Sequence, residues 1–176
     1  MVVYDIYTDA GKFGDLAVVM YKNDSEIYRD SLKRDTKKSH NEYEYHAVIY
    51  ALQESLPQQV NVLNDTDQVV VHSDSQLVIN QVNEIYKCES DKLRRCKLTV
   101  QNIRDAYDKK NIKITFEWVP RERNPAGWIL EMKKQFRVRS DLLDHVVNYT
   151  DIKARIEKLR KEGKLSFTVK ELLKES

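Results

Sequence analysis

The chain has 176 residues, of which 41% are hydrophobic and 33% are charged. That length and composition fit one compact α/β domain with a core of its own and a short appendage. Basic and acidic residues nearly balance, leaving a net charge of +2. Nucleic-acid binding through bulk positive charge is therefore excluded, and any such contact must come from a local basic patch.

Neither the cysteines nor the N-terminus indicates a secreted or membrane protein. The spacing of Cys88 and Cys96 matches no common zinc motif, so we expect two reduced thiols. The first residues lead directly into an alternating strand pattern, with no long apolar run and no signal peptide. We therefore expect a soluble, cytoplasmic protein without a membrane partner.

Three strands are predicted before the first helix. Residues 2–9 and 26–32 have strand patterns, and residues 16–21 form an apolar run between them. Their short connections predict an antiparallel meander. A helix follows over residues 41–56, which Pro57 is expected to end; its core face carries Tyr45, Val48, Ile49 and Leu52.

Strands and helices then alternate. Residues 69–71 form a short apolar run, typical of a strand buried on both faces, that leads to Asp74. Helices are predicted over residues 75–86 and 92–109, with core residues that include Ile85 in the first, and a strand is predicted over residues 112–119. A charged loop and a helix from about Ala126 complete a mixed sheet with helices on its faces.

The C-terminal part differs in pattern, so we divide the chain into a domain of residues 1–139 and a helical extension of residues 140–176. Ile152, Ile156 and Leu159 lie at helical spacing in the extension. Its basic residues are interleaved with acids, which favours a solvated helix over a nucleic-acid-binding arm. The apolar stripe must pack on the domain or on a partner, so a protein partner or self-association through these helices stays open.

Three acids lie where side chains can converge. Asp9 ends the first predicted strand, Asp74 follows the fourth, and Glu44 lies early in the first helix. If the first and fourth strands are parallel neighbours, both aspartates reach the carboxyl edge of the sheet, where open α/β sheets bind ligands. Clustered carboxylates repel one another unless a hard cation such as Mg²⁺ or Mn²⁺ neutralises them. The alternatives are that Asp9 or Asp74 caps a helix and that Glu44 is a solvated helix residue.

Four segments, taken together, resemble type 1 ribonuclease H. They are Tyr7-Thr8-Asp9, then Asn41 to Ala47 (NEYEYHA), then Asp74 to Gln81 (DSQLVINQ), and finally Trp118 to Asn124 (WVPRERN). They occur in family order over about residues 1–135, and the second and third together are the specific part of the resemblance. The family's first three acids match Asp9, Glu44 and Asp74.

The resemblance implies a five-stranded mixed sheet, with three antiparallel strands followed by two parallel ones, and hydrolysis of the RNA strand of RNA/DNA hybrids by two divalent ions, Mg²⁺ or Mn²⁺. Ser39 and Asn41 match positions that meet the DNA strand, and Gln76 matches a position in the minor groove, where RNA displays its 2′-hydroxyls. Arg121, Arg123 and Asn124 are further candidate contacts, although solvation of this loop is an equally good interpretation of its arginines.

The match to the family is incomplete. In the family the fourth acid normally follows Asn-x-x-Ala, but the segment from Asn124 to Trp128 (NPAGW) carries no acid. Glu131 lies one helical turn after Gly127, on the same face, and is our candidate for the fourth metal-binding acid. A loop histidine and a basic protrusion found in some members are also absent. We therefore keep three hypotheses: a hybrid-specific endonuclease, a nuclease of the same fold with another substrate, and a degenerate module that binds nucleic acid or protein without cutting.

Overall fold

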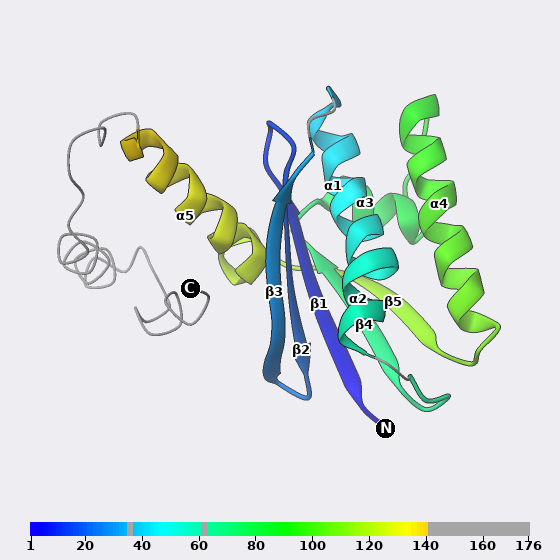
Figure 1. The fold of residues 1–176 in the computed structure, drawn as a ribbon. Helices are drawn as coiled ribbons and strands as arrows, with labels where there is room; N and C mark the ends of the chain where they lie inside the picture. The colour runs from blue at the N-terminus through cyan, green and yellow to red at the C-terminus, as the bar shows by residue number, and fades with distance from the viewer. Residues whose placement is uncertain (35–36, 61–62, 141–176) are drawn as a thin grey trace. The chain divides into compact units, whose positions relative to one another are not determined.

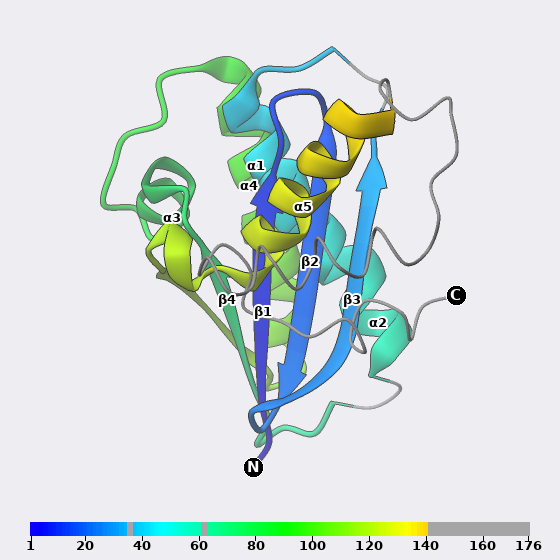
Figure 2. The ribbon, with the colours of Figure 1, turned by 90° about the vertical axis from the view of Figure 1, so that its left-hand side faces the viewer.

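The computed structural model describes residues 1–34, 37–60 and 63–140, and its centre is a five-stranded mixed sheet. The sheet has the order β3-β2-β1-β4-β5 (Figures 1 and 2). Neighbours are antiparallel from β3 to β1 and parallel from β1 to β5. The strands are β1 (Val3–Ala10), β2 (Asp15–Lys22), β3 (Ser25–Lys33), β4 (Gln68–Ser73) and β5 (Lys113–Trp118). The predicted five-stranded mixed sheet is confirmed.

Helices cover one face of this sheet (Figure 1). Three of the helices begin after a serine N-cap, which is Ser39, Ser75 or Ser90. Each serine side chain accepts a hydrogen bond from a backbone N–H of the helix's first turn. These helices are α1 (His40–Tyr50), α3 (Gln76–Val82) and α4 (Asp91–Asp108). A 3₁₀ turn, Arg121–Arg123, follows β5 and leads into α5 (Pro125–Ser140).

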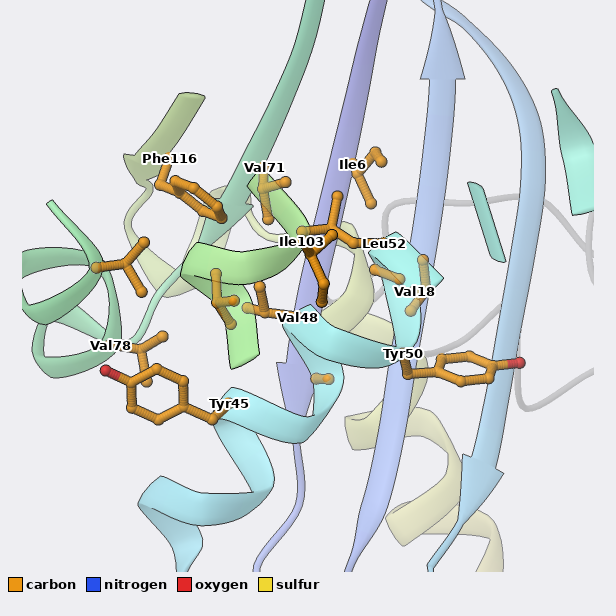
Figure 3. Close-up of a cluster of buried hydrophobic side chains, with 14 of the residues drawn as sticks. Ile6, Val18, Tyr45, Val48, Tyr50, Leu52, Val71, Val78, Ile103 and Phe116 are labelled. Carbon is orange, nitrogen blue, oxygen red and sulfur yellow. The ribbon is translucent and has the colours of Figure 1, made fainter. Parts of the chain in front are cut away.

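The main core lies between the helices and the sheet. Alternate residues of β1 and β2, among them Ile6 and Val18, meet Tyr45, Val48 and Leu52 of the helical layer (Figure 3). These side chains are almost fully buried, and burying each one stabilises the fold by roughly 1.5–3 kcal/mol. A smaller apolar cluster on the opposite face joins Ala17 and Val19 of β2 to Ala126.

Two predicted helix boundaries are wrong. The first helix does not end at Pro57 but continues through a π-helical segment (Ala51–Ser55) into α2 (Leu56–Gln59). Pro57 is the second residue of α2 and directly follows the π-helical segment, whose wider turn differs from the i to i−4 pattern that a proline interrupts. The helix predicted over residues 75–86 ends at Val82, because Glu84 has a left-handed backbone with φ of 64°, and this leaves Ile85 67% exposed rather than in the core.

The chain forms two compact units, Met1–Glu131 and Met132–Ser176, and each is considered by itself. The helices predicted for the C-terminal extension lie outside the described residues, so the boundary after residue 139 stays a prediction. In the part of the chain that the structure describes, no helix is both long and apolar enough to cross a membrane.

The hairpin between β1 and β2 depends on Gly14. Its φ is +86°, and a Cβ atom added there would lie 2.4 Å from the backbone oxygen of Arg34. We expect Gly14→Ala to lower the free energy of unfolding by at least roughly 1–3 kcal/mol, measured by urea denaturation. Gly11→Ala is the matched control, because the nearest atom to its added Cβ would be a side-chain atom of Asp15 at 3.3 Å. Equal losses in the two variants would contradict this explanation.

Candidate metal centre

The pairing of β1 with β4 brings two aspartates together. The strands run parallel, with Thr8 opposite Ser73 as the last pair in the register. Asp9 and Asp74 are the next residue on each strand path, so both carboxylates reach the same edge of the sheet. This is the arrangement predicted from the strand ends.

Helix α1 brings the third acid to the same edge. Ser39 and Glu42 form a capping box: the Ser39 hydroxyl accepts from the Glu42 N–H, and the Glu42 carboxylate accepts from the Ser39 N–H at 2.9 Å. The cap fixes the first turn of α1, and Glu44 lies at the start of the second turn. Glu44 is only 4% exposed, so it is not a solvated helix residue.

The three acids form one compact cluster. Each of Asp9, Glu44 and Asp74 offers a carboxylate oxygen, and these atoms lie within 4.8 Å of one another. The Oε2 atom of Glu44 is buried and has no hydrogen-bond partner. An all-oxygen donor set with a buried unpartnered oxygen fits a hard divalent cation such as Mg²⁺ or Mn²⁺. These residues can therefore hold such an ion.

The electrostatics of the cluster agree with this fit. Burial and the neighbouring Asp74 raise the pKa of Asp9 to about 7. Burial, together with the charges of Asp9 and Asp74, raises the pKa of Glu44 well above its usual value. The Ala10 N–H and the charge of Arg121 oppose both shifts and do not offset them. Without a cation, the buried site therefore favours the protonated forms of Asp9 and Glu44.

Two polar side chains, which sequence reasoning did not assign to this role, hold Asp74 in place. Asn124 donates to the Thr8 carbonyl at 2.9 Å and to Asp74 Oδ1 at 3.3 Å, and its own carbonyl accepts from the Ala126 N–H at the start of α5. Trp118 donates its indole N–H to the Asp74 backbone oxygen at 3.1 Å.

Asn124 is completely buried, so we assign it to holding the site together and not to the nucleic-acid contact expected from the sequence. Trp118 is 45% exposed, so it lies at the rim of the site and outside the core.

Asp74 does not cap a helix. Ser75 is the N-cap residue of α3 and accepts from the Val78 N–H at 3.4 Å. Asp74 is left free to face Asp9 and Glu44. Arg121 approaches it from the solvent side, with Nη1 3.8 Å from Asp74 Oδ2 and the arginine side chain 70% exposed.

The remaining predicted residues surround the cluster without joining it. The side chains of Ser39, Asn41, Gln76, Arg121 and Arg123 are exposed, as contacts to a large ligand require. Glu131 is also exposed and is not one of the three clustered acids. A Cβ atom added at Gly127 would lie 3.2 Å from Asp9 Oδ2. Position 127, which carries no side chain, therefore faces the cluster directly.

The model of the reverse transcriptase-like family matches residues 8–130, which include all three clustered acids. The chain belongs to this family. Its domain is ribonuclease H-like, as the four sequence segments indicated. No curated protein matches the chain in sequence.

Solved structures of ribonucleases H share this fold. LC11-RNase H1, isolated from compost by a metagenomic approach and solved with an RNA/DNA hybrid, is 19% identical with a TM-score of 0.57, over 71% of this chain and 89% of that one. RNase H1 from Halobacterium salinarum is 20% identical with a TM-score of 0.57 over the same shares. An N-terminal RNase H domain from Mycobacterium tuberculosis is 20% identical with a TM-score of 0.57, over 78% of this chain and 99% of that domain.

The raised pKa of Asp9 predicts how stability without metal depends on pH. The folded protein keeps a proton on Asp9 that the unfolded chain releases, so stability falls as pH rises from about 4 to about 7. In EDTA, the free energy of unfolding of Asp9→Asn should decrease less over this pH range than that of the wild type. The difference between the two proteins should grow by on the order of 2 kcal/mol from the lower to the higher pH. Urea denaturation across the pH range measures it.

Glu122→Gln, which removes an exposed acid of the neighbouring loop, is the control and should follow the wild-type curve. Adding Mg²⁺ at pH 7.5 should stabilise the wild type and leave Asp9→Asn nearly unchanged. Parallel curves for wild type and Asp9→Asn would show that the cluster does not hold the proton.

Proposed function

We propose that this protein is a metal-dependent endonuclease that hydrolyses the RNA strand of RNA/DNA hybrids. The observation that carries the proposal is the buried cluster of Asp9, Glu44 and Asp74, with its unpartnered Glu44 oxygen, at the carboxyl edge of a ribonuclease H-like sheet. Such a cluster is costly to bury unless a cation occupies it. A divalent cation beside a phosphodiester is the standard means of cutting it.

Asp9, Glu44 and Asp74 would hold the divalent ions, which would supply an activated water and stabilise the leaving oxygen, so that hydrolysis would leave a 3′-hydroxyl and a 5′-phosphate. The protein's own groups hold and surround that chemistry. Asn124 and Trp118 fix Asp74, and the capping box of α1 fixes the approach of Glu44. Arg121, exposed beside Asp74, is placed to meet a phosphate.

The substrate class rests on fold and likeness together. LC11-RNase H1 was solved with an RNA/DNA hybrid. Ser39 and Asn41, matched to contacts with the DNA strand, and Gln76, matched to a contact in the minor groove, are exposed. We propose the same substrate class here. A nuclease of the same fold that acts on duplex RNA or branched DNA is the nearest alternative.

A second candidate function is binding without cleavage. It is favoured by Gly127, which leaves the position facing Asp9 without an acid, and by the exposure of Glu131 outside the cluster. This candidate predicts that the protein binds a labelled hybrid but does not cut it in Mg²⁺ or Mn²⁺.

Asp74→Asn is the direct test of the proposed activity. It keeps the side-chain shape but removes one metal-binding charge, so cleavage of a labelled RNA/DNA hybrid in Mg²⁺ should fall at least about a hundredfold. Asp65→Asn, which changes an exposed acid outside the cluster, should cleave like wild type. Cleavage at the wild-type rate by Asp74→Asn would refute the metal mechanism.

The same assay, run in parallel on hybrid, duplex RNA and branched DNA, identifies the substrate. Preferential cleavage of the hybrid supports the proposal, and preferential cleavage of another substrate supports the nearest alternative. Binding of the hybrid with no turnover in either metal supports the non-catalytic module.

We also propose that Glu131 provides the fourth carboxylate when substrate and ions are bound. It lies one helical turn after Gly127, on the same face of α5, and its side chain is longer than the aspartate that the family pattern places earlier. Glu131→Gln should then raise the Mg²⁺ concentration that gives half-maximal cleavage by about tenfold, with Glu122→Gln as control. Identical Mg²⁺ dependence in wild type and Glu131→Gln would assign Glu131 to the solvated surface.

A further inference from the structure

His40 contacts the metal-binding cluster from a position that the family resemblance does not assign. It is the first residue of α1, and its Nε2 atom lies 3.2 Å from Oε1 of Glu44, one helical turn later. The histidine side chain is 45% exposed, whereas the Glu44 side chain is 5% exposed. The imidazole thus lies between solvent and a buried carboxylate.

This contact makes the two oxygens of Glu44 unequal. Oε1 has the imidazole at hydrogen-bonding distance, while Oε2 is buried without a partner. A glutamate has three rotatable side-chain bonds and a broad terminal torsion, so an isolated Glu44 carboxylate would sample several orientations. A partner on one oxygen limits that freedom and presents the other oxygen to a ligand.

We propose that His40 is a positioning residue that holds Glu44 in its metal-binding orientation. The close approach of His40 Nε2 to Oε1 limits the orientations of the carboxylate and leaves Oε2 as the oxygen offered to a divalent cation. Groups that orient a metal ligand in this way commonly contribute about 10- to 100-fold to metal affinity or activity. The proposal rests on the metal site of the proposed function, and it adds a residue outside the acids to that site.

The start of α1 does not depend on the side chain of His40. Ser39, the residue before it, caps α1 through its own side chain and Glu42. Either a neutral imidazole with its proton on Nε2 or an imidazolium offers the required N–H, so the contact does not rely on a change of protonation.

His46 is a matched control on the same helix. It lies two residues after Glu44, is half-buried, and has Lys38, Arg34 and Glu42 as its charged surroundings instead of the cluster acids. A helix turns by about 100° per residue, so a side chain two positions away points to another side. Replacing His46 removes a histidine from α1 without removing a contact to Glu44.

The test measures Mn²⁺ binding to the full chain by calorimetry and by electron paramagnetic resonance, without nucleic acid. His40→Ala should weaken Mn²⁺ binding by about tenfold. His40→Gln keeps an N–H donor of similar reach and should bind within about threefold of wild type. His46→Ala should bind like wild type. Thermal unfolding of each variant shows whether the fold is retained.

Cleavage adds a second readout that a structural role would not move. At low Mn²⁺, His40→Ala should cleave the hybrid more slowly than wild type, and raising the Mn²⁺ concentration about tenfold should restore the rate. Thermal unfolding without metal separates this rescue from stabilisation of a weakened fold, because a variant as stable as wild type has no lost fold to restore.

The outcomes separate this inference from the proposed function. Mn²⁺ affinity of His40→Ala equal to wild type, or His40→Gln as weak as His40→Ala, would overturn the role of His40 even if the wild type cuts hybrids. Mn²⁺ binding that depends on His40 in a protein that cuts no hybrid would support the inference and refute the proposed activity. A wild type that binds no Mn²⁺ would overturn both.

Discussion

The parallel pairing of β1 with β4 is the constraint on which the site depends. It places Asp9 and Asp74 side by side at the carboxyl edge of the sheet, and the same packing of α1 on the sheet that buries Tyr45 and Val48 brings Glu44 to them. The fold thus cannot form its core without bringing three carboxyl groups together. Mutual repulsion and loss of hydration oppose ionisation there, which is why the pKa values of Asp9 and Glu44 are raised.

The groups around the cluster orient the acids but neutralise little of their charge. Asn124 and Trp118 give Asp74 neutral donors, and the nearest arginine atom to Asp74 is 3.8 Å away on a mostly exposed side chain. The charge of this arginine opposes the rise in the pKa of Asp9 and Glu44 but does not offset it. These contacts therefore fix the positions of the carboxyl groups but do not compensate the negative charge that they carry when ionised. An added cation would compensate that charge and would bind the free oxygen of Glu44.

The sequence predicted the sheet and the three acids well because both follow from local patterns: strand periodicity set the order of elements, and the strand ends located Asp9 and Asp74. It could not decide whether Asp74 caps a helix, since a cap depends on backbone geometry that places Ser75 there instead. It misjudged Pro57, because a π-helical segment before the proline let the helix continue. The contact of His40 with Glu44 had a signal, the i, i+4 spacing, but only the fold shows that this helical face meets the cluster.

Gly127 lies directly beside the carboxylate of Asp9. In the sequence it belongs to a segment, Asn124 to Trp128, that lacks the family's fourth acid. In the structure a side chain at this position would touch the carboxylate of Asp9. Even a methyl group there would need Asp9 to give way by a few tenths of an ångström. A short acid at position 127 would thus crowd Asp9, whereas a longer acid from the next turn could approach from further away. The glycine therefore leaves space beside Asp9 that a longer acid from the next turn of the helix could enter.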